Sequence, residues 1–486
     1  MKHAHIIRAF ILLCVKNRID WNFMNNIFDL VVIGSGPGGY RAAVLAKLRG
    51  IEDVAIVEQA AWGGCCLNRG CVPKKAWHHT ARLITSSQAA QARGVVGSLQ
   101  GDLQAAWVHQ REVVKGVRES YSDYLKRLGI ATFQGAAHFI DAHTLAVGEV
   151  TLTARHAVIA TGSSPFIPDA FPRTPGRILT TDDLFDAPPP AGRRVAILGS
   201  GVIGTEFAFI LKQLGCDVVW MSNTAPLSHS AFSPAALSLL ENALKPLNIP
   251  LYPRAQTVQV LPDGVMLQFA DGRSEQVDWV LLGSGRRPHT DGLQLDAAGV
   301  NTDEQDFVIT NDYRQTNVAH IFAIGDVANP RMTANHAMAD ADIAITNLLV
   351  PQSRASNPHA VPELVYSALE MGRIGLNEDM AIDEGLEPAV GFSAFETNPC
   401  ALGQDDSAGF VRLIADMDSG SLLGAEVIGS EAGEIIYTIA TQMGHDDALH
   451  RLAHLGVNHP ARAEEIRNAT ETLAVKWGLS AQVFCD

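Results

Sequence analysis

FDLVVIGSGPGGYRAAVLAKL, at residues 28–48, carries the clearest structural signal in the chain. Residues 28–33 are a short apolar run, which predicts a buried strand of a parallel sheet. The glycine-rich turn GSGPGG follows, and residues 40–48 continue with good helix formers. Strand, tight turn and helix in this order predict the first half of a parallel βαβ unit.

The glycine spacing of this turn predicts a dinucleotide site. Gly34 permits the tight turn, Gly36 lets a pyrophosphate approach the helix N-terminus, and Gly39 lets helix and strand pack closely. A second apolar run, residues 54–57, stops at Glu58, which stands about twenty residues after the glycines, where an acid binds ribose hydroxyls. A glycine triplet alone is often an ordinary turn, but this context favours dinucleotide binding.

The same pattern occurs again in the middle of the chain. Residues 194–198 (RVAIL) and 218–221 predict strands on either side of a second turn and helix. No acid follows the second strand, and no arginine stands there for a 2′-phosphate; Ser222 can instead hydrogen-bond a ribose, so NAD is favoured over NADP, which is not excluded. The glycines expected to hold this nucleotide are Gly199, Gly201 and Gly204.

Proline-rich joins and a change of pattern predict the domain organisation. Alternating segments at 410–415 and 422–428, with a helix at 432–443, indicate a C-terminal α+β domain. The fold class is therefore α/β, with two Rossmann-like domains followed by the α+β domain. The predicted boundaries are an extension at 1–27, a first nucleotide domain at 28–165 and 291–355, a second at 166–290, and a C-terminal domain at 356–486.

Net charge, cysteine count and the length of apolar runs argue against several classes of protein. The chain of 486 residues has 37 basic and 52 acidic side chains, a formal net charge of −15, which argues against a nucleic-acid partner. Seven cysteines without a repeating framework favour a reducing, cytoplasmic compartment. The longest early apolar run, residues 9–15, is too short for a membrane helix and lacks a cleavage site after it.

The segment GGCCLNRGCVPKK, residues 63–75, holds the reactive chemistry. Cys66 and Cys71 are five steps apart, about 7.5 Å along an ideal helix, so a bridge between them needs a distorted turn, which Gly70 makes possible. Pro73 suits the start of a helix, whose positive end would lower the pKa of the Cys71 thiol. Two buried packing residues, or zinc ligands without a second pair, are the alternatives, and Cys65 is interpreted as a packing residue.

Together these motifs resemble the FAD-dependent pyridine nucleotide–disulfide oxidoreductases, the group of dihydrolipoamide dehydrogenase and glutathione reductase. The resemblance extends from residue 28 to about residue 477. Each motif is weak alone, but their order is specific. Besides the segments above it includes Ala160-Thr161-Gly162, GRRP at 285–288, AIGDV at 323–327, and His459-Pro460 followed by Glu464.

The resemblance implies two bound dinucleotides and a redox-active disulfide. FAD would occupy the first glycine turn, with Asp326 near its ribitol, and NAD(P) the second. Cys71 would face the flavin while Cys66 exchanges with the substrate. The other residues implied in cofactor binding are Thr161, Gly162 and Gly285.

The resemblance also implies two ionic pairs. Lys75 and Glu206 would pair beside the flavin ring. His459, oriented by Glu464, would be the acid–base, supplied across a homodimer interface. The residues agree with this role, since imidazole titrates near neutrality and a carboxylate on one ring nitrogen fixes its tautomer.

Details of the turns favour one member of the group. GSGPGGY and GSGVIGTEFA are similar to the dihydrolipoamide dehydrogenases, whereas GCVPKK is closer to glutathione reductase. The sequence therefore predicts oxidation of a dihydrolipoyl group by NAD⁺, with a lipoylated carrier or a small dithiol as partner and no metal. The alternatives are an NAD(P)H-dependent reductase of a small disulfide or of mercuric ion, and a docking flavoprotein subunit dedicated to a lipoylated assembly.

Overall fold

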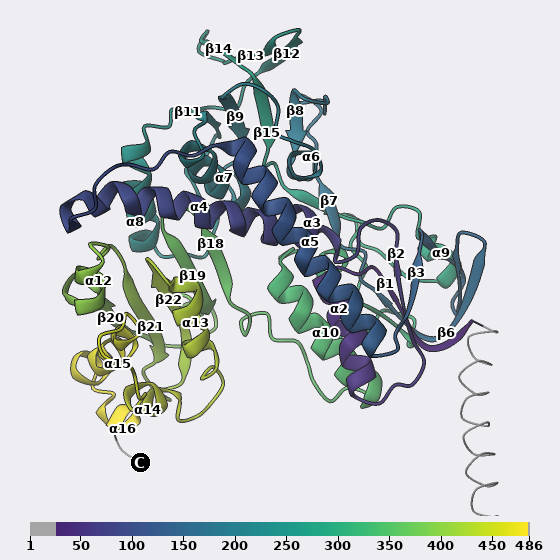
Figure 1. The fold of residues 1–486 in the computed structure, drawn as a ribbon. Coiled ribbons are helices and arrows are strands. Elements are labelled where there is room, and N and C mark those ends of the chain that lie inside the picture. The colour runs from purple at the N-terminus through teal and green to yellow at the C-terminus, as the bar shows by residue number, and fades with distance from the viewer. Residues whose placement is uncertain (1–25, 485–486) are drawn as a thin grey trace, which may run out of the picture. The chain divides into compact units, whose positions relative to one another are not determined.

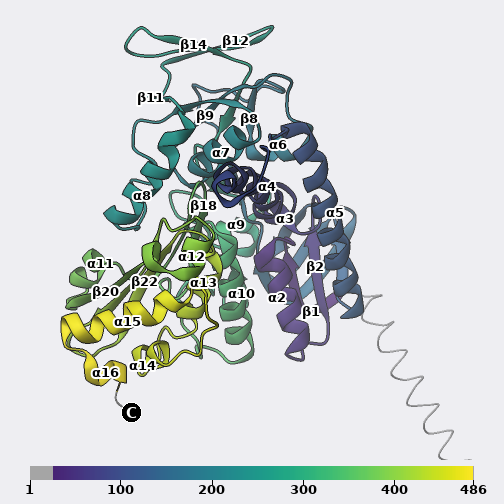
Figure 2. The same cartoon turned by 60° about the vertical axis from the view of Figure 1, so that its left-hand side comes forward.

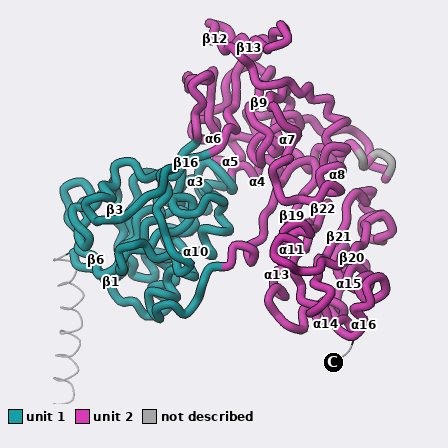
Figure 3. Tube along the Cα trace, turned by 180° about the vertical axis from the view of Figure 1, so that it is seen from behind, with its two compact units in different colours: residues 1–72, 112–165, 286–356 teal, residues 73–111, 166–285, 357–486 magenta. Residues whose placement is uncertain are grey.

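The computed structural model describes residues 26–484, apart from the side chains at positions 89, 91 and 92. Most of the predicted N-terminal extension and Cys485 lie outside the described residues. The chain divides into two compact units (Figure 3). The first comprises Met1–Val72, Glu112–Pro165 and Arg286–Ser356, and the second comprises Pro73–Arg111, Phe166–Gly285 and Asn357–Asp486.

A seven-stranded sheet forms the centre of the first unit, in the order β3-β2-β1-β6-β5-β4, with β17 paired to β6 (Figure 1). Strands β3, β2, β1, β6 and β17 run parallel, whereas β4 and β5 form an antiparallel extension of β6. The strands are β1 (Ile27–Ile33), β2 (Val54–Glu58), β3 (Ala131–Gln134), β4 (Ala137–Asp141), β5 (Thr144–Val147), β6 (Val150–Ile159) and β17 (Ile321–Ala323).

The first apolar run is a central strand of this sheet, as predicted. Its last four residues, 30–33, are buried: Leu30 and Val32 belong to a core cluster with residues of two helices, and the other two belong to a cluster with residues of β4 and β5. Helices α2 (Pro37–Leu48) and α10 (Ala334–Leu349) pack side by side, as Figures 1 and 2 show. Helix α2 begins three residues before the predicted start, with proline in its first turn, where the missing N–H costs no hydrogen bond.

The register of the strands gathers the expected cofactor residues at one edge. Ile33 pairs with Val57 on one side and with Ile159 on the other. The three strands therefore end together, and the residues that follow them lie at the same carboxyl edge. In open parallel sheets this edge is where ligands bind.

The second unit contains a five-stranded parallel sheet in the order β11-β10-β9-β15-β8. Its strands are β8 (Ile178–Thr180), β9 (Arg194–Leu198), β10 (Asp217–Met221), β11 (Leu251–Tyr252) and β15 (Trp279–Leu282). Helices α7 (Val202–Gln213) and α8 (Pro234–Leu244) belong to it, together with a small antiparallel sheet of β12 (Thr257–Leu261), β13 (Gly264–Gln268) and β14 (Ser274–Val277). The two strands predicted here from the second repeat are both present.

An antiparallel sheet with helices packed on it follows in the same unit, in the order β18-β19-β22-β21-β20 (Figure 2). Its strands are β18 (Glu363–Tyr366), β19 (Glu370–Gly375), β20 (Pro388–Ala394), β21 (Phe410–Asp416) and β22 (Leu422–Ile428), and its helices are α13 (Ala432–Ala440), α14 (Ala448–Ala453), α15 (Glu464–Trp477) and α16 (Ser480–Phe484). The helix predicted to reach residue 443 ends at Ala440. The Thr441 amide still bonds four residues back, but the amides of Gln442 and Met443 bond three residues back, which tightens and ends the helix before Gly444.

Two long helices, α4 (Cys71–Ala89) and α5 (Leu103–Arg127), and several short elements make up the rest of the described chain. The short elements are α3 (Gly64–Arg69), α6 (Thr181–Asp186), α9 (Leu295–Ala298), α11 (Glu378–Asp383), α12 (Pro399–Gly403), β7 (Ser163–Pro165) and β16 (Arg286–Pro288), with 3₁₀ turns η1 (Ala90–Arg93), η2 (Lys245–Leu247), η3 (Gly325–Val327) and η4 (Phe395–Thr397). Among residues 26–484, no helix has the length and apolar character needed to cross a membrane.

Candidate active site

The first glycine turn has the geometry of a phosphate cradle. Gly34 has a φ of +102°, and a Cβ on it would lie 2.3 Å from the Ala160 carbonyl oxygen. A Cβ on Gly39 would lie 1.9 Å from the carbonyl oxygen of Gly34, whereas one on Gly36 would meet nothing within 4 Å. No side chain caps α2 at Gly36, so its first amides are available to an anion. This turn fits a dinucleotide pyrophosphate.

Glu58 has a second role that the sequence did not indicate. Its carboxylate is buried, and it accepts hydrogen bonds from the Ser35 amide (3.0 Å), the Ser35 hydroxyl (2.6 Å) and the Ala60 amide (2.8 Å). Glu58 therefore stabilises the glycine turn through Ser35, which lies between Gly34 and Gly36. Its contact with a ribose stays a prediction.

A chain of polar contacts in the first unit orients Asp326. The Ser163 hydroxyl donates to Asp326 Oδ2 at 2.6 Å, and the Arg286 guanidinium donates to the Ser163 hydroxyl (2.7 Å) and carbonyl (2.8 Å). Burial raises the pKa of Asp326, while the Ser163 hydrogen bond and the Arg286 charge oppose that rise. Two residues before Ser163, the Thr161 hydroxyl donates to the His289 carbonyl at 2.7 Å, which holds the chain that leads to Ser163.

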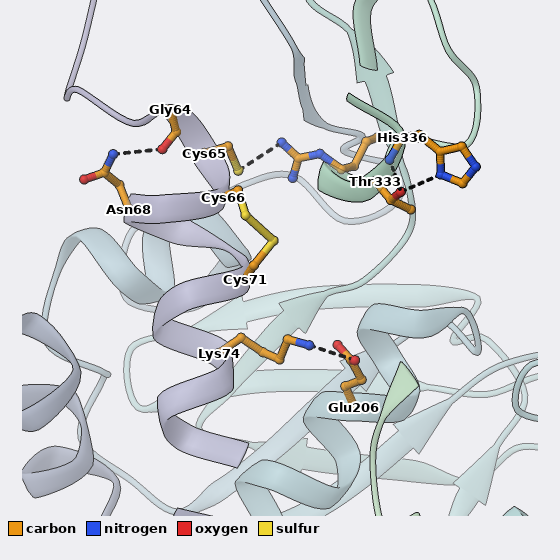
Figure 4. Close-up of a disulfide and its surroundings, with 10 residues drawn as sticks. Gly64, Cys65, Cys66, Asn68, Cys71, Lys74, Glu206, Thr333 and His336 are labelled. Atoms are coloured by element: carbon orange, nitrogen blue, oxygen red, sulfur yellow. Dashed lines mark hydrogen bonds and ion pairs between the residues drawn. A yellow bond between two sulfur atoms is a disulfide. The ribbon is translucent and has the colours of Figure 1, made fainter. Parts of the chain in front are cut away.

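Cys66 and Cys71 form a disulfide across a break between two helices (Figure 4). Helix α3 ends at Arg69, Gly70 has φ −133° and ψ −112°, and α4 begins at Cys71. The break brings the two Cα atoms to 4.8 Å, so the predicted distorted turn at Gly70 is confirmed. A Cβ on Gly70 would lie 3.2 Å from the Cα of Cys66, which favours glycine there. Cys71 lies at the positive end of α4, where a thiolate is stabilised.

Neighbouring side chains hold the disulfide segment. Asn68 is buried, and its amide donates to the carbonyls of Gly64 (2.8 Å) and Trp62 (3.0 Å), while Arg118 donates to its oxygen at 3.0 Å. The Arg286 guanidinium lies 3.5 Å from the Cys65 sulfur. Within the described part of the chain, no group of three or more His, Cys, Asp or Glu side chains is arranged to hold a metal.

The predicted pairing of Lys75 with Glu206 is wrong, because Lys74 makes this ion pair. Lys74 Nζ lies 2.8 Å from Glu206 Oε1, and both side chains are largely buried (Figure 4). The same oxygen accepts the Tyr366 amide at 2.8 Å. Both lysines contact the Tyr366 ring, but successive residues of a helix point about 100° apart, and only the Lys74 ammonium, 4.9 Å from the ring centroid, also reaches the Glu206 carboxylate. The Lys75 ammonium lies 3.1 Å from the centroid of the Tyr366 ring, and burial lowers the pKa of Lys75.

The second glycine turn repeats the geometry of the first. Gly199 has a φ of +112°, a Cβ on Gly204 would lie 1.9 Å from the Gly199 carbonyl oxygen, and one on Gly201 would meet nothing within 4 Å. Beyond β10, the Ser222 hydroxyl accepts the Thr224 amide at 3.1 Å. The turn fits a second pyrophosphate. Gly285 has a φ of +108°, with no atom within 4 Å of a Cβ placed on it, so its backbone can be approached closely.

His459 and Glu464 form the predicted pair. His459 Nδ1 lies 3.0 Å from Glu464 Oε2, and the Ala461 amide donates to Oε1 of the same carboxylate at 2.7 Å. The hydrogen bond from His459, followed by that from the Ala461 amide, lowers the pKa of Glu464. The His459 side chain is 72% exposed, so its second ring nitrogen is accessible. The pair can take up a proton from a group that approaches this surface.

Comparison with known proteins gives consistent matches. The family model described as pyridine nucleotide-disulphide oxidoreductase matches residues 28–341, and the model of that family's dimerisation domain matches residues 361–470. Dihydrolipoyl dehydrogenase 3 of Haloarcula marismortui is 30% identical over 467 residues, covering 92% of this chain and 97% of the relative. Dihydrolipoyl dehydrogenase of Thermus scotoductus is 32% identical over 464 residues, with the same coverage.

Two solved structures have a similar fold. The structure of LpdA from Mycobacterium tuberculosis has a TM-score of 0.84 at 23% identity, covering 91% of this chain and 99% of that chain. The HOCl-induced flavoprotein disulfide reductase RclA from Escherichia coli has a TM-score of 0.79 at 23% identity, with the same coverage. The two likenesses agree with the observed succession of parallel and antiparallel sheets.

Proposed function

The chain belongs to the pyridine nucleotide-disulphide oxidoreductase family, and on that premise we propose that it is a dihydrolipoyl dehydrogenase. It oxidises a dihydrolipoyl group and transfers two electrons to NAD⁺. The observation that carries the proposal is the Cys66–Cys71 disulfide, closed across Gly70 at the start of α4. The relatives named dihydrolipoyl dehydrogenase, which match over nearly their whole length, favour a dihydrolipoyl substrate.

The first glycine turn, the segment around Thr161 and Gly162, and Asp326 would hold FAD. They lie at the carboxyl edge of one sheet, where α2 presents uncapped amides. When bound, FAD supplies two-electron chemistry between the cysteine pair and a nicotinamide. The second turn would hold NAD⁺, since its uncapped helix α7 starts in the same way.

The cysteine pair performs thiol–disulfide exchange. A substrate thiolate attacks the Cys66 sulfur, the Cys66–Cys71 bond breaks, and Cys71 leaves as a thiolate stabilised by the N-terminus of α4. The second substrate thiolate then attacks the sulfur bonded to Cys66. This forms the substrate disulfide, releases Cys66 as a thiolate that takes up a proton, and leaves the pair reduced by two electrons.

His459 accepts the proton of the attacking substrate thiol. Its Nδ1–H donates to ionised Glu464, so Nε2 is left as the basic nitrogen. We assign this histidine to the disulfide of a partner subunit in a homodimer, since the family's dimerisation model covers the segment that contains it. The carboxylate stabilises the imidazolium that forms.

Steady-state kinetics of the FAD-loaded protein test this proposal. Dihydrolipoamide should reduce NAD⁺ faster than NADP⁺, and lipoamide should be the preferred disulfide in the reverse direction. A reductase that uses glutathione disulfide or mercuric ion with NADPH, and is inactive with either form of lipoamide, would overturn the substrate while retaining the cysteine pair. Activity only with a lipoylated carrier domain, and none with free dihydrolipoamide, would favour the docking subunit.

A further inference from the structure

The His459 loop, which comprises residues 459–464, carries one buried guanidinium, that of Arg462. Arg462 is 1% exposed and stands three residues after His459 and two before Glu464. Arginine is rarely buried unless it is paired, because removing its charge from water is costly. A buried arginine at this position therefore needs partners.

Arg462 is bound to the segment that follows α12. Its Nε and Nη2 donate to the Gln404 side-chain oxygen at 3.2 and 2.9 Å, and Nη2 also donates to the Asp406 carbonyl at 2.6 Å. The guanidinium carbon lies 5.4 Å from the centroid of the buried Phe395 ring. One side chain thus joins the His459 loop to both residues 404 and 406.

Asp406 extends this connection to α4. Its Oδ2 lies 3.4 Å from Arg462 Nη2 and 3.3 Å from Nη2 of Arg82, and it accepts a hydrogen bond from the Ser430 hydroxyl. Arg82 lies on α4 and also donates to the Ala368 carbonyl at 3.3 Å. The carboxylate is therefore shared between the His459 loop and the helix whose first residue is Cys71.

Asn398, which comes just before α12, holds the backbone of the His459 loop. The Asn398 amide donates to the Ala461 carbonyl at 3.0 Å and to Glu465 Oε1 at 2.8 Å. Asn398 also caps α12, since its side-chain oxygen accepts the Ala401 amide at 3.0 Å. Residues 398–406 therefore hold the loop at its backbone and, through Arg462, at its side chain.

We propose that Arg462 is a positioning residue for the His459–Glu464 pair, acting with Asp406 and tied through it to α4. This inference rests on the proposed role of His459 as the base. Glu464 contacts both His459 and the Ala461 amide, so movement of residues 461–462 changes the carboxylate that orients the imidazole. A displacement of about 1 Å at a reacting group can cost about 100-fold in rate.

The Arg462→Met variant tests the proposal. Methionine fills much of the same volume. The Asp406 carboxylate keeps its ion pair with Arg82, so the substitution leaves no unpaired carboxylate. Dithiothreitol, a generic dithiol, serves as the probe: the rate at which it reduces the Cys66–Cys71 disulfide is followed by rapid quench and alkylation of the FAD-loaded protein. The matched control is Arg451→Met, which removes an exposed arginine paired with Asp447 on α14.

The expected result depends on pH. At pH 7 the variant should be slower than the wild type by about 10- to 100-fold. At pH 9, above the ordinary thiol pKa of about 8.5, the dithiol ionises without a base, and the defect should shrink to less than threefold. The control should match the wild type at both pH values. A rate within twofold of wild type at pH 7, or an equal defect at both pH values, would overturn the proposal.

A second variant covers failure of the first to fold. Gln404 is exposed, and Gln404→Met removes the acceptor of two hydrogen bonds from Arg462. It should show the same pH-dependent defect at about threefold, and wild-type rates at both pH values would overturn the proposal. Because dithiothreitol replaces the physiological substrate, failure of dihydrolipoamide turnover in the wild type would reject the proposed substrate without deciding the role of Arg462.

Discussion

Replacing Glu464 by glutamine separates the orientation of His459 from all other functions of the site. The carboxylate accepts two hydrogen bonds at once, from His459 Nδ1 at 3.0 Å and from the Ala461 amide at 2.7 Å. Glutamine offers one oxygen and one NH₂ group. If the NH₂ group faces the Ala461 amide, two donors face each other. If it faces His459 Nδ1, the imidazole can accept that hydrogen bond only as the Nε2–H tautomer, in which Nε2 is no longer the basic nitrogen.

The expected loss of activity can be worked out from the one charged hydrogen bond that the glutamine variant loses. A hydrogen bond to a charged group contributes about 1.5–3 kcal/mol. If the loss falls on the transition state, it corresponds to about 12- to 160-fold in kcat, at about 1.36 kcal/mol per factor of ten. We therefore expect kcat for dihydrolipoamide oxidation to fall by about that factor, with KM little changed, because the existing contact between His459 and Glu464 strengthens when the imidazolium forms and the substrate itself does not contact Glu464.

The assay compares two activities of one preparation. Reduction of ferricyanide by NADH needs the nucleotide sites but neither the cysteine pair nor His459, and should be unchanged in the glutamine variant. The hydrogen bond from His459 lowers the pKa of Glu464. The wild-type carboxylate is therefore ionised throughout pH 5–7, and its protonation should not contribute to a loss of activity in that range. Wild-type kcat in the variant, or equal loss of both activities, would show that Glu464 does not orient His459 for catalysis.

Three further outcomes follow from the site. Cys66→Ser should abolish dithiol oxidation yet retain bound FAD, as measured by turnover and flavin absorbance; normal turnover would contradict the exchange role. Gly36→Ala should fold but bind FAD weakly, whereas Gly39→Ala should yield little folded protein, since its Cβ would lie 1.9 Å from a carbonyl oxygen; equal yields and affinities would argue against the cradle. Lys74→Met leaves buried Glu206 without its cation, which costs about 3 kcal/mol and should lower the melting temperature; an unchanged melting temperature would contradict this.

The elements that the sequence predicted well are those with a strong local signal. Residues 28–33 and 194–198 are apolar runs buried on both faces, and the observed strands agree within one residue. The glycine turns have spacing that backbone sterics enforce, so their geometry could also be anticipated. The helix predicted to end at residue 443 was too long, because apolar periodicity continues beyond the last regular helical hydrogen bond.

The parts of the site that the sequence did not predict depend on tertiary packing. Whether Lys74 or Lys75 meets Glu206 depends on the rotation of α4, which two adjacent lysines do not reveal. Ser163 is an ordinary residue in the sequence, and only the fold brings its hydroxyl to Asp326. Arg462 likewise has no local signal, since its partners come from residues almost sixty positions earlier.

Anaerobic titration of the FAD-loaded protein with dihydrolipoamide tests whether a dihydrolipoyl group exchanges with the Cys66–Cys71 disulfide. One equivalent per subunit should open the Cys66–Cys71 disulfide, expose two alkylatable thiols and change the flavin spectrum, and added NAD⁺ should then yield one equivalent of NADH. An oxidised spectrum and an intact disulfide in excess dihydrolipoamide, in protein that NADH or NADPH does reduce, would contradict this exchange.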